Sequence, residues 1–150
     1  MFIRELEYED YDAASKLLWK SFYEAEKHTA SMEGMEIFRD LTSAVSLSIN
    51  NMDDNLSFYG AFQGEELTAV GAIKNENHIL LLYVLPERQG CGIGSSLLRY
   101  LESICKGDTL TVNSSDFACC FYEEKGYRKV GQRTVEKGLA VTPMVKKRTE

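Results

Sequence analysis

The residues best suited to do chemistry in this chain are glycines spaced two apart. Gly90, Gly92 and Gly94 follow an apolar run that ends at Pro86 and lead into a helical pattern that begins at Ile93. Glycine tolerates positive φ and allows a ligand to approach the backbone closely. A helix that begins here would point unpaired N–H groups, and the positive end of its dipole, at a bound anion. The segment therefore predicts a phosphate-binding site.

Two common phosphate-binding designs do not fit these glycines. A P-loop has a lysine directly after its last glycine, and no lysine follows Gly94. A dinucleotide-binding fingerprint has the spacing G-x-G-x-x-G and opens a βαβ unit with an acidic residue about 20 residues later. Here the spacing is G-x-G-x-G and the segment begins past the middle of the chain, so too little sequence follows for such a unit.

The elements that must position this segment follow from hydrophobic periodicity. A short strand over residues 2–6 precedes a helix that starts near Glu9 and Asp10, and a second helical pattern covers residues 35–49. Two apolar runs, 56–62 and 67–74, flank a turn with one glycine and predict a hairpin. The run 78–85 is nearly all apolar, which is typical of a strand covered on both faces.

The rest of the chain also predicts helices alternating with strands. A helical stripe from residue 93 ends at Gly107, a short strand covers 109–112, and a helix over about 115–125 ends at Gly126. Residues 127–136 and 139–145 predict a closing hairpin. The order predicts one α/β domain over residues 1–150, with a mixed central sheet and helices on both faces.

Composition narrows the class of partner. The formal net charge is -6, which leaves no basic field for nucleic acid, and no apolar stretch approaches the roughly 18 residues of a membrane span. The four cysteines lack the paired spacing of a zinc site, so no metal is expected. No secretory pattern is visible at the N-terminus, and reduced thiols in a cytoplasmic protein are the simplest expectation.

The glycine segment also matches a known signature, in which Gln or Arg is followed by two residues, Gly, one residue, and Gly or Ala. Here it reads Gln89-Gly90-Cys91-Gly92-Ile93-Gly94, and downstream stand Asn113, Ala118 and the run Phe121-Tyr122-Glu123-Glu124-Lys125-Gly126-Tyr127. Together with the order of elements, these residues resemble the GCN5-related N-acetyltransferase (GNAT) family over nearly the whole chain. The resemblance implies a GNAT fold and acetyl-coenzyme A as the acetyl donor.

The resemblance also implies which residues hold the donor. In the family, backbone groups of the fourth strand bind the pantetheine arm, the glycine-segment amides bind the pyrophosphate, and an Asn at the end of the fifth strand bonds to the pantetheine. The corresponding residues here are Leu82, Tyr83, Val84, Gln89, Gly90, Cys91, Gly92, Ile93, Gly94, Ser95 and Asn113.

Acetyl transfer to an amine needs a neutral amine and a proton for the leaving thiolate. By the resemblance, Tyr122 is that proton donor, with Phe117 and Phe121 facing the core beside it. His78 stands where histone-acetylating members have a glutamate base. A lysine-like amine costs roughly 4 to 5 kcal/mol to hold neutral at pH 7, so a base matters for such an acceptor. Glu76 and water remain the alternatives to His78.

Family members build the acceptor pocket from the first two helices, the loop between them and the last hairpin. Trp19, Tyr23 and Glu26 are the candidates here, and the resemblance also allows a homodimer. The acceptor is an amine of a small molecule or of a peptide or protein, and the sequence does not choose between these. A non-catalytic acyl-coenzyme A sensor or interaction module on the same fold is the competing interpretation.

Overall fold

The computed structural model of this chain describes residues 1–50, 52 and 55–148. The strands are β1 (Phe2–Glu5), β2 (Leu56–Gln63), β3 (Glu66–Lys74), β4 (His78–Val84), β5 (Thr109–Ser114), β6 (Arg128–Lys129), β7 (Thr134–Glu136) and β8 (Leu139–Lys147). The helices are α1 (Tyr11–Glu26), α2 (Met32–Leu41), α3 (Ala44–Asn50), α4 (Ile93–Ile104) and α5 (Cys119–Glu124), with short 3-10 turns at Tyr8–Asp10 and Pro86–Arg88. Within these described residues, no helix is long and apolar enough to cross a membrane.

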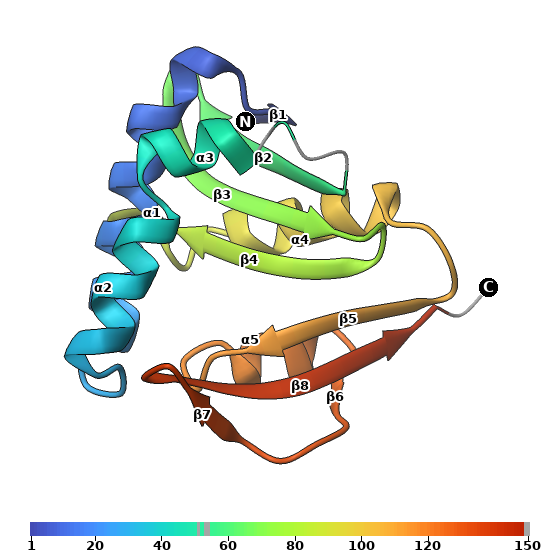
Figure 1. Cartoon of the computed structure of the whole chain (residues 1–150). Coiled ribbons are helices and arrows are strands. Elements are labelled where there is room, and N and C mark those ends of the chain that lie inside the picture. The colour runs from blue at the N-terminus through green and yellow to red at the C-terminus, as the bar shows by residue number, and fades with distance from the viewer. Residues whose placement is uncertain (51, 53–54, 149–150) are drawn as a thin grey trace.

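The strands form one mixed sheet in the order β1-β2-β3-β4-β5-β8-β6, and β7 pairs with β8. All neighbouring strands are antiparallel except β4 and β5. Figure 1 shows the two halves of the sheet diverging from this parallel junction, with α1, α2 and α3 on one side of the first half and α4 behind it. The mixed sheet with helices on both faces confirms the predicted fold class.

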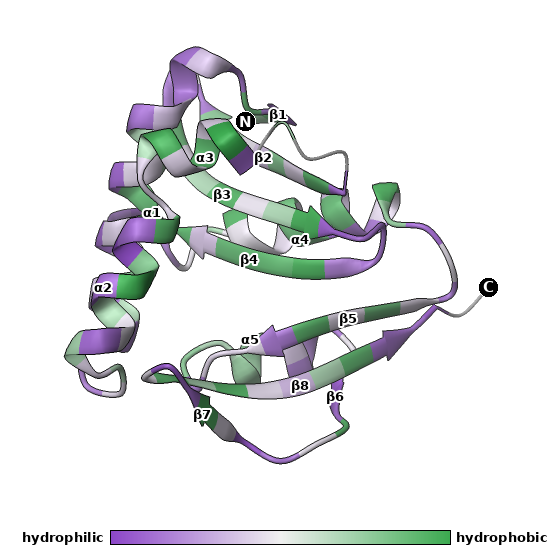
Figure 2. Ribbon diagram, in the orientation of Figure 1, coloured by the Kyte–Doolittle hydropathy of each residue, from purple (hydrophilic) through white to green (hydrophobic). Residues whose placement is uncertain are grey.

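Two buried clusters hold the helices onto the sheet. One packs α4 and α5 against the sheet through Leu97, Leu98, Leu101 and Tyr122, and the other packs α1 and α3 against the opposite face through Leu17, Leu18 and Leu47. Figure 2 shows hydrophobic residues concentrated on the central strands, whereas the outer turns of α1 and α2 are largely hydrophilic. Burial of these apolar faces supplies the main favourable term in folding.

The divergence of the sheet has a local cause in β4. Ile73 pairs with Ile79, whereas the next pair is Ala72 with Leu81, so Leu80 is an extra residue without a partner in β3. Such a β-bulge bends a strand and redirects the residues after it. The parallel pairing of β4 with β5 covers only His78↔Thr111 and Ile79↔Val112, so it ends directly before the bulge. The bulge therefore opens the sheet between β4 and β5.

Three sequence predictions need correction. The helix predicted over residues 35–49 is two helices, because the Thr42 hydroxyl bonds back to the Phe38 carbonyl (2.7 Å) and the Ser43 hydroxyl caps α3 by accepting from the Ser46 amide (3.2 Å). The strand β4 is not covered on both faces, since Leu80 is 39% exposed beside the opening. The helix predicted over residues 115–125 is shortened to α5, which begins at Cys119.

The closing hairpin is also more divided than predicted. The strand expected over residues 127–136 is broken into β6 and β7. The break faces Pro143 of β8, whose carbonyl accepts from the Val130 amide (3.0 Å) but which has no N–H to continue the ladder. Lys137 and Gly138, both at positive φ, form the tight turn between β7 and β8 that the sequence predicted.

Candidate active site

The glycine segment joins the end of β4 to the start of α4. Gly90 and Gly92 adopt φ of 80° and 82°, and Gly92 is the residue from which α4 begins. A Cβ at either position would meet nothing within 4 Å, so both glycines leave open space above the backbone. Gly94 is helical, and a Cβ there would contact the Val84 side chain at 3.4 Å. The first two glycines thus serve conformation and access, and the third serves packing.

The N-terminus of α4 has the properties of an anion site. The first four N–H groups of a helix lack intrahelical partners, and here they belong to Gly92, Ile93, Gly94 and Ser95. The dipole of this twelve-residue helix adds positive potential at the same place. Open backbone and unpaired amides together fit the pyrophosphate of a coenzyme A molecule.

A cleft of about 750 Å³ runs from this helix N-terminus into the gap between β4 and β5. Of the residues expected to hold the donor, all except Cys91 line it, namely Leu82, Tyr83, Val84, Gln89, Gly90, Gly92, Ile93, Gly94, Ser95 and Asn113. Cys91 is exposed beside the cleft. The structure therefore gathers ten of these eleven residues around one continuous space.

The end of β4 is held by two side chains that bond to one carbonyl. The Val84 carbonyl accepts from the Ser21 hydroxyl of α1 (3.0 Å) and from the Gln89 side-chain amide (3.2 Å). Both lone pairs of this oxygen are taken, so it has none left for a ligand. Gln89, expected at the coenzyme, thus also fixes the strand from which the glycine segment departs.

Asn113 stands on the other edge of the cleft, near the end of β5. It is exposed, lines the cleft and pairs in the β5–β8 register with Pro143. Its position across the gap from β4 is compatible with the expected contact to a ligand that lies between the strands.

Tyr122 lies on α5, where its ring packs in the hydrophobic core and also borders the cleft. It is 4% exposed, packs edge to face on Tyr127 at 5.3 Å between ring centroids, and lines the cleft. Burial raises the pKa of its hydroxyl well above the ordinary value, so the phenol stays protonated at neutral pH.

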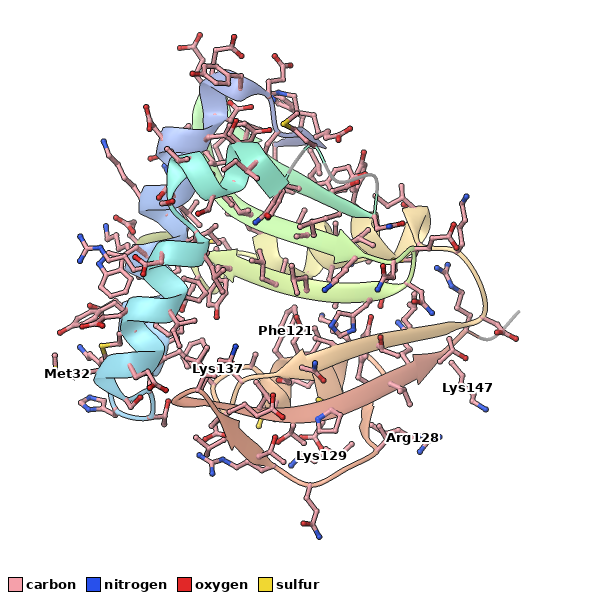
Figure 3. The ribbon with its side chains drawn as sticks, in the orientation of Figure 1. Met32, Phe121, Arg128, Lys129, Lys137 and Lys147 are labelled. Carbon is pink, nitrogen blue, oxygen red and sulfur yellow. The ribbon has the colours of Figure 1, made fainter. Side chains whose placement is uncertain are left out.

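The aromatic neighbours of Tyr122 differ from the sequence prediction. Phe117 was expected to face the core with Phe121, but it is 60% exposed because it precedes α5 instead of lying within it. Phe121 packs against the core and also lines the cleft. Figure 3 shows Phe121 projecting from α5 toward the space between the two halves of the sheet.

His78 lies at the closed end of the opening, where β4 and β5 still pair. Its Nδ1 is 2.7 Å from the Thr111 hydroxyl, and it is not among the residues that line the cleft. Burial, with a smaller contribution from Lys74, lowers the pKa of His78. Glu76, the alternative base, sits in the preceding turn and faces Lys106 at 3.7 Å. The structure thus brings neither residue together with Tyr122.

The three acceptor candidates on α1 separate into two groups. Trp19 stacks under the Arg39 guanidinium (4.8 Å to the ring centroid) and Tyr23 is 42% exposed, and neither lines the cleft. Glu26, the last residue of α1, is 4% exposed and does line it. Burial, and to a lesser extent the charge of Asp116, raises the pKa of Glu26 to about 7.

The acetyltransferase (GNAT) domain family matches residues 26–148 of this chain. The chain belongs to the GNAT acetyltransferases. By membership of this family, whose donor is acetyl-coenzyme A, it is an N-acetyltransferase. The family predicted from Gln89 to Gly94 and the downstream motif is thereby confirmed.

Solved structures of other GNAT proteins share the fold. A GCN5-related N-acetyltransferase from Rhodopseudomonas palustris is 23% identical, with a TM-score of 0.85 and coverage of 97% of this chain and 94% of that one. A PaiA N-acetyltransferase from Thermoplasma acidophilum, solved with coenzyme A, is 21% identical, with a TM-score of 0.79 and 98% coverage of each chain. A mutant spermidine N-acetyltransferase SpeG from Vibrio cholerae is 17% identical, with a TM-score of 0.65 and coverage of 98% and 95%. No curated protein matches the chain.

Several residues that shape this GNAT cleft were not predicted. Ser21 continues the buried stripe of Leu17 and Leu18, so a hydroxyl on an apolar helix face was the available signal. Phe38 of α2 stacks on Phe22 at 3.9 Å between centroids and lines the cleft. It lies in the region expected to build the acceptor pocket, although its periodicity favoured the core. The Leu80 bulge has no signal in the sequence, because it is defined by pairing with β3.

Proposed function

We propose that this GNAT protein transfers the acetyl group of acetyl-coenzyme A directly to an amine of a small molecule or of a peptide or protein. The observation that supports this most is the continuity of one cleft between the α4 N-terminus and Tyr122. A donor with its pyrophosphate on the α4 amides would run its arm along β4 and present its thioester near the α5 hydroxyl.

In this proposal, some residues bind the donor and others act in the transfer step. Gly90 and Gly92 keep the approach to the amides open, the free backbone groups of Leu82 and Tyr83 hold the arm, and Asn113 bonds to it from β5. Backbone amides near Leu80 to Leu82, where the pairing of β4 with β5 has ended, polarise the thioester carbonyl, as oxyanion-type donors do. Tyr122, whose phenol is protonated at neutral pH, gives its proton to the departing thiolate.

The sensor or interaction module is not favoured by the site. A module that only binds acyl-coenzyme A has no use for a protonated phenol on the wall of the cleft. The family assignment points the same way.

Release of free coenzyme A thiol tests the function. Acetyl-coenzyme A is mixed with the protein and, in separate reactions, with phenethylamine, tyramine, spermidine, free amino acids or a lysine peptide. The proposal expects amine-dependent thiol release and a mass gain of one acetyl group on the amine. Tight coenzyme A binding without release for any amine would refute it and favour the sensor.

A further inference from the structure

Among the residues that the structure describes, Glu26 is the one acidic residue that lines the cleft. The charged residues on its described walls are Glu26, Lys74 and Arg88, and no histidine is among them. Glu26 is 4% exposed, and its Oε2 atom is fully buried without a hydrogen-bond partner among the described residues. Burying a carboxylate without a partner costs free energy. A group that pairs with Glu26 in the cleft therefore satisfies the strongest unpaired interaction of the site.

The groups around Glu26 leave it without a cation. Tyr83 of β4 interacts electrostatically with both Glu26 and Tyr122, which places the three side chains in one neighbourhood. Asp116, before α5, repels the Glu26 charge. Its own carboxylate accepts a 2.9 Å hydrogen bond at Oδ1 from Arg133 Nε. No lysine, arginine or histidine of the described chain lies within ion-pair distance of Glu26. Burial of the carboxylate raises its pKa to about 7, which suits proton exchange near neutrality.

The walls on this side of the cleft are apolar. Phe22 and Phe38 stack at 3.9 Å, and the Phe38 ring meets Tyr83 edge to face at 5.7 Å. Leu41 and Leu47 extend the same surface toward α3. The other charges on the walls, Lys74 and Arg88, are cations, although Arg88 is paired with Glu66. On the walls that the structure describes, a second ammonium group of a polyamine therefore has no carboxylate to meet.

We infer that Glu26 is the general base of this enzyme and that its acceptor is a primary monoamine carried on an apolar body. This inference rests on the proposed function. The ammonium group pairs with Glu26, and the apolar body packs on Phe22 and Phe38. One proton passes from the ammonium nitrogen to the Glu26 carboxylate. The freed nitrogen lone pair then forms the C–N bond to the acetyl carbonyl carbon.

Breaking the thioester and removing the last proton complete the reaction. The C–S bond breaks, its electron pair goes to sulfur, and Tyr122 supplies the proton that makes the free thiol. The nitrogen, cationic after attack, loses its second proton to water through the open cleft, and Glu26 releases the first. One of these two protons replaces the one that Tyr122 gave to sulfur, so both residues return to their starting forms. The sum is one ammonium ion and one thioester converted to one amide, one thiol and one proton released to solvent, with no oxidant or metal required.

A base at Glu26 also fits the geometry better than one at His78. His78 has its Nδ1 engaged by Thr111 at 2.7 Å and stands at the closed end of the strand gap, outside the cleft walls. Glu26 and Tyr122 both line the cleft, so proton acceptor and proton donor face the same reacting centre.

The test compares the wild type with Glu26→Gln, Glu26→Asp and, as matched control, His78→Gln. Thiol release is measured from pH 6 to 9.5 with phenethylamine, tyramine and spermidine. We expect Glu26→Gln to lower kcat about 100-fold, to abolish the acid limb of the pH profile and to leave acetyl-coenzyme A affinity unchanged. Glu26→Asp retains intermediate activity, His78→Gln retains the acid limb, and phenethylamine exceeds spermidine at least tenfold in kcat/KM.

If the kcat of Glu26→Gln is within threefold of the wild-type value and its pH profile keeps the acid limb, the assignment of the base is overturned. A preference for spermidine overturns the acceptor class. If the wild type acetylates no amine, the proposed function has failed by itself. Calorimetric titration of phenethylamine into the coenzyme A complex then decides the inference separately. Binding that disappears in Glu26→Gln supports the recognition by Glu26, and absence of binding to the wild type overturns it.

Discussion

The backbone amide of Ser31 donates a 3.0 Å hydrogen bond to the carbonyl of Gly138. This bond joins the start of α2 to the turn between β7 and β8, and so ties the helical side of the cleft to its closing hairpin. Figure 3 shows the neighbours Met32 and Lys137 where these two segments meet. A Cβ at Gly138 would stand 1.8 Å from the Ser31 hydroxyl and 2.8 Å from the Gly34 amide nitrogen. Only glycine permits the contact.

The Gly138→Ala change is therefore expected to part the two segments. Gly64→Ala is the matched control, because Gly64 also has a positive φ (60°) in a hairpin turn but has open space around it. Each change costs roughly 1–2 kcal/mol of unfolding free energy for the left-handed conformation. Gly138→Ala should lose more than this in chemical denaturation and should raise the KM of the amine, with acetyl-coenzyme A affinity unchanged. Equal effects of the two changes would show that the Ser31 contact is unimportant.

Gly92 provides a prediction about the donor. Its φ of 82° matches the φ of 85° at Gly107, which lies in the turn after α4 and does not line the cleft. Alanine at either position carries the same conformational cost of roughly 1–2 kcal/mol. Gly92→Ala alone should also weaken acetyl-coenzyme A binding about tenfold, because its methyl group obstructs access to the α4 amides. Calorimetry on both variants measures this, and similar affinities for the two would contradict the assigned phosphate site.

Tyr122→Phe isolates the hydroxyl of the proposed acid. Turnover should fall about 100-fold, since general acid catalysis typically contributes that much or more, while acetyl-coenzyme A affinity stays constant. Tyr127→Phe is the control from the same aromatic pair, because its hydroxyl donates a 2.7 Å hydrogen bond to Glu102 and does not line the cleft. That variant should lose stability, by about 1.5–3 kcal/mol, and keep its turnover. Full turnover in Tyr122→Phe would exclude the tyrosine as proton donor.

Sequence reasoning reached the parts of this protein that depend on local chemistry. The glycines at 90, 92 and 138 tolerate positive φ, and the structure has positive φ at each. Tyr122 was found through its place in a motif, and the structure puts it on the cleft. These features need few distant partners, which is why a linear pattern predicts them.

Features that depend on pairing across the fold were beyond the same reasoning. The Leu80 bulge is defined by the register between β3 and β4, and nothing in the apolar run 78–85 marks it. The break between α2 and α3 depends on where the Thr42 and Ser43 hydroxyls bond. Glu26 was a minor acceptor candidate, because its burial and the nearby charge of Asp116, from a segment distant in sequence, are known only once the chain is folded.

The pH dependence of stability separates Glu26 from His78, because their pKa values move in opposite directions. The pKa of Glu26 is raised in the fold to about 7, so the folded state holds a proton that the unfolded state releases near its ordinary value of 4.5. Its contribution to stability is complete below pH 4.5 and is lost as pH rises toward 7. The pKa of His78 is lowered from 6.5, so its contribution is complete above pH 6.5 and is lost as pH falls below that value.

Urea denaturation of Glu26→Gln and His78→Gln at half-unit steps from pH 4.5 to 8 measures both terms. Relative to the wild type, Glu26→Gln should gain unfolding free energy progressively as pH rises to 7, because glutamine removes the buried charge without changing the shape. His78→Gln should gain relative stability only as pH falls below 6.5, because the unfolded wild type then takes up a proton that the folded state resists. Parallel curves for Glu26→Gln and the wild type would mean that the carboxylate is solvated in the fold, and would remove the physical basis for Glu26 as a base.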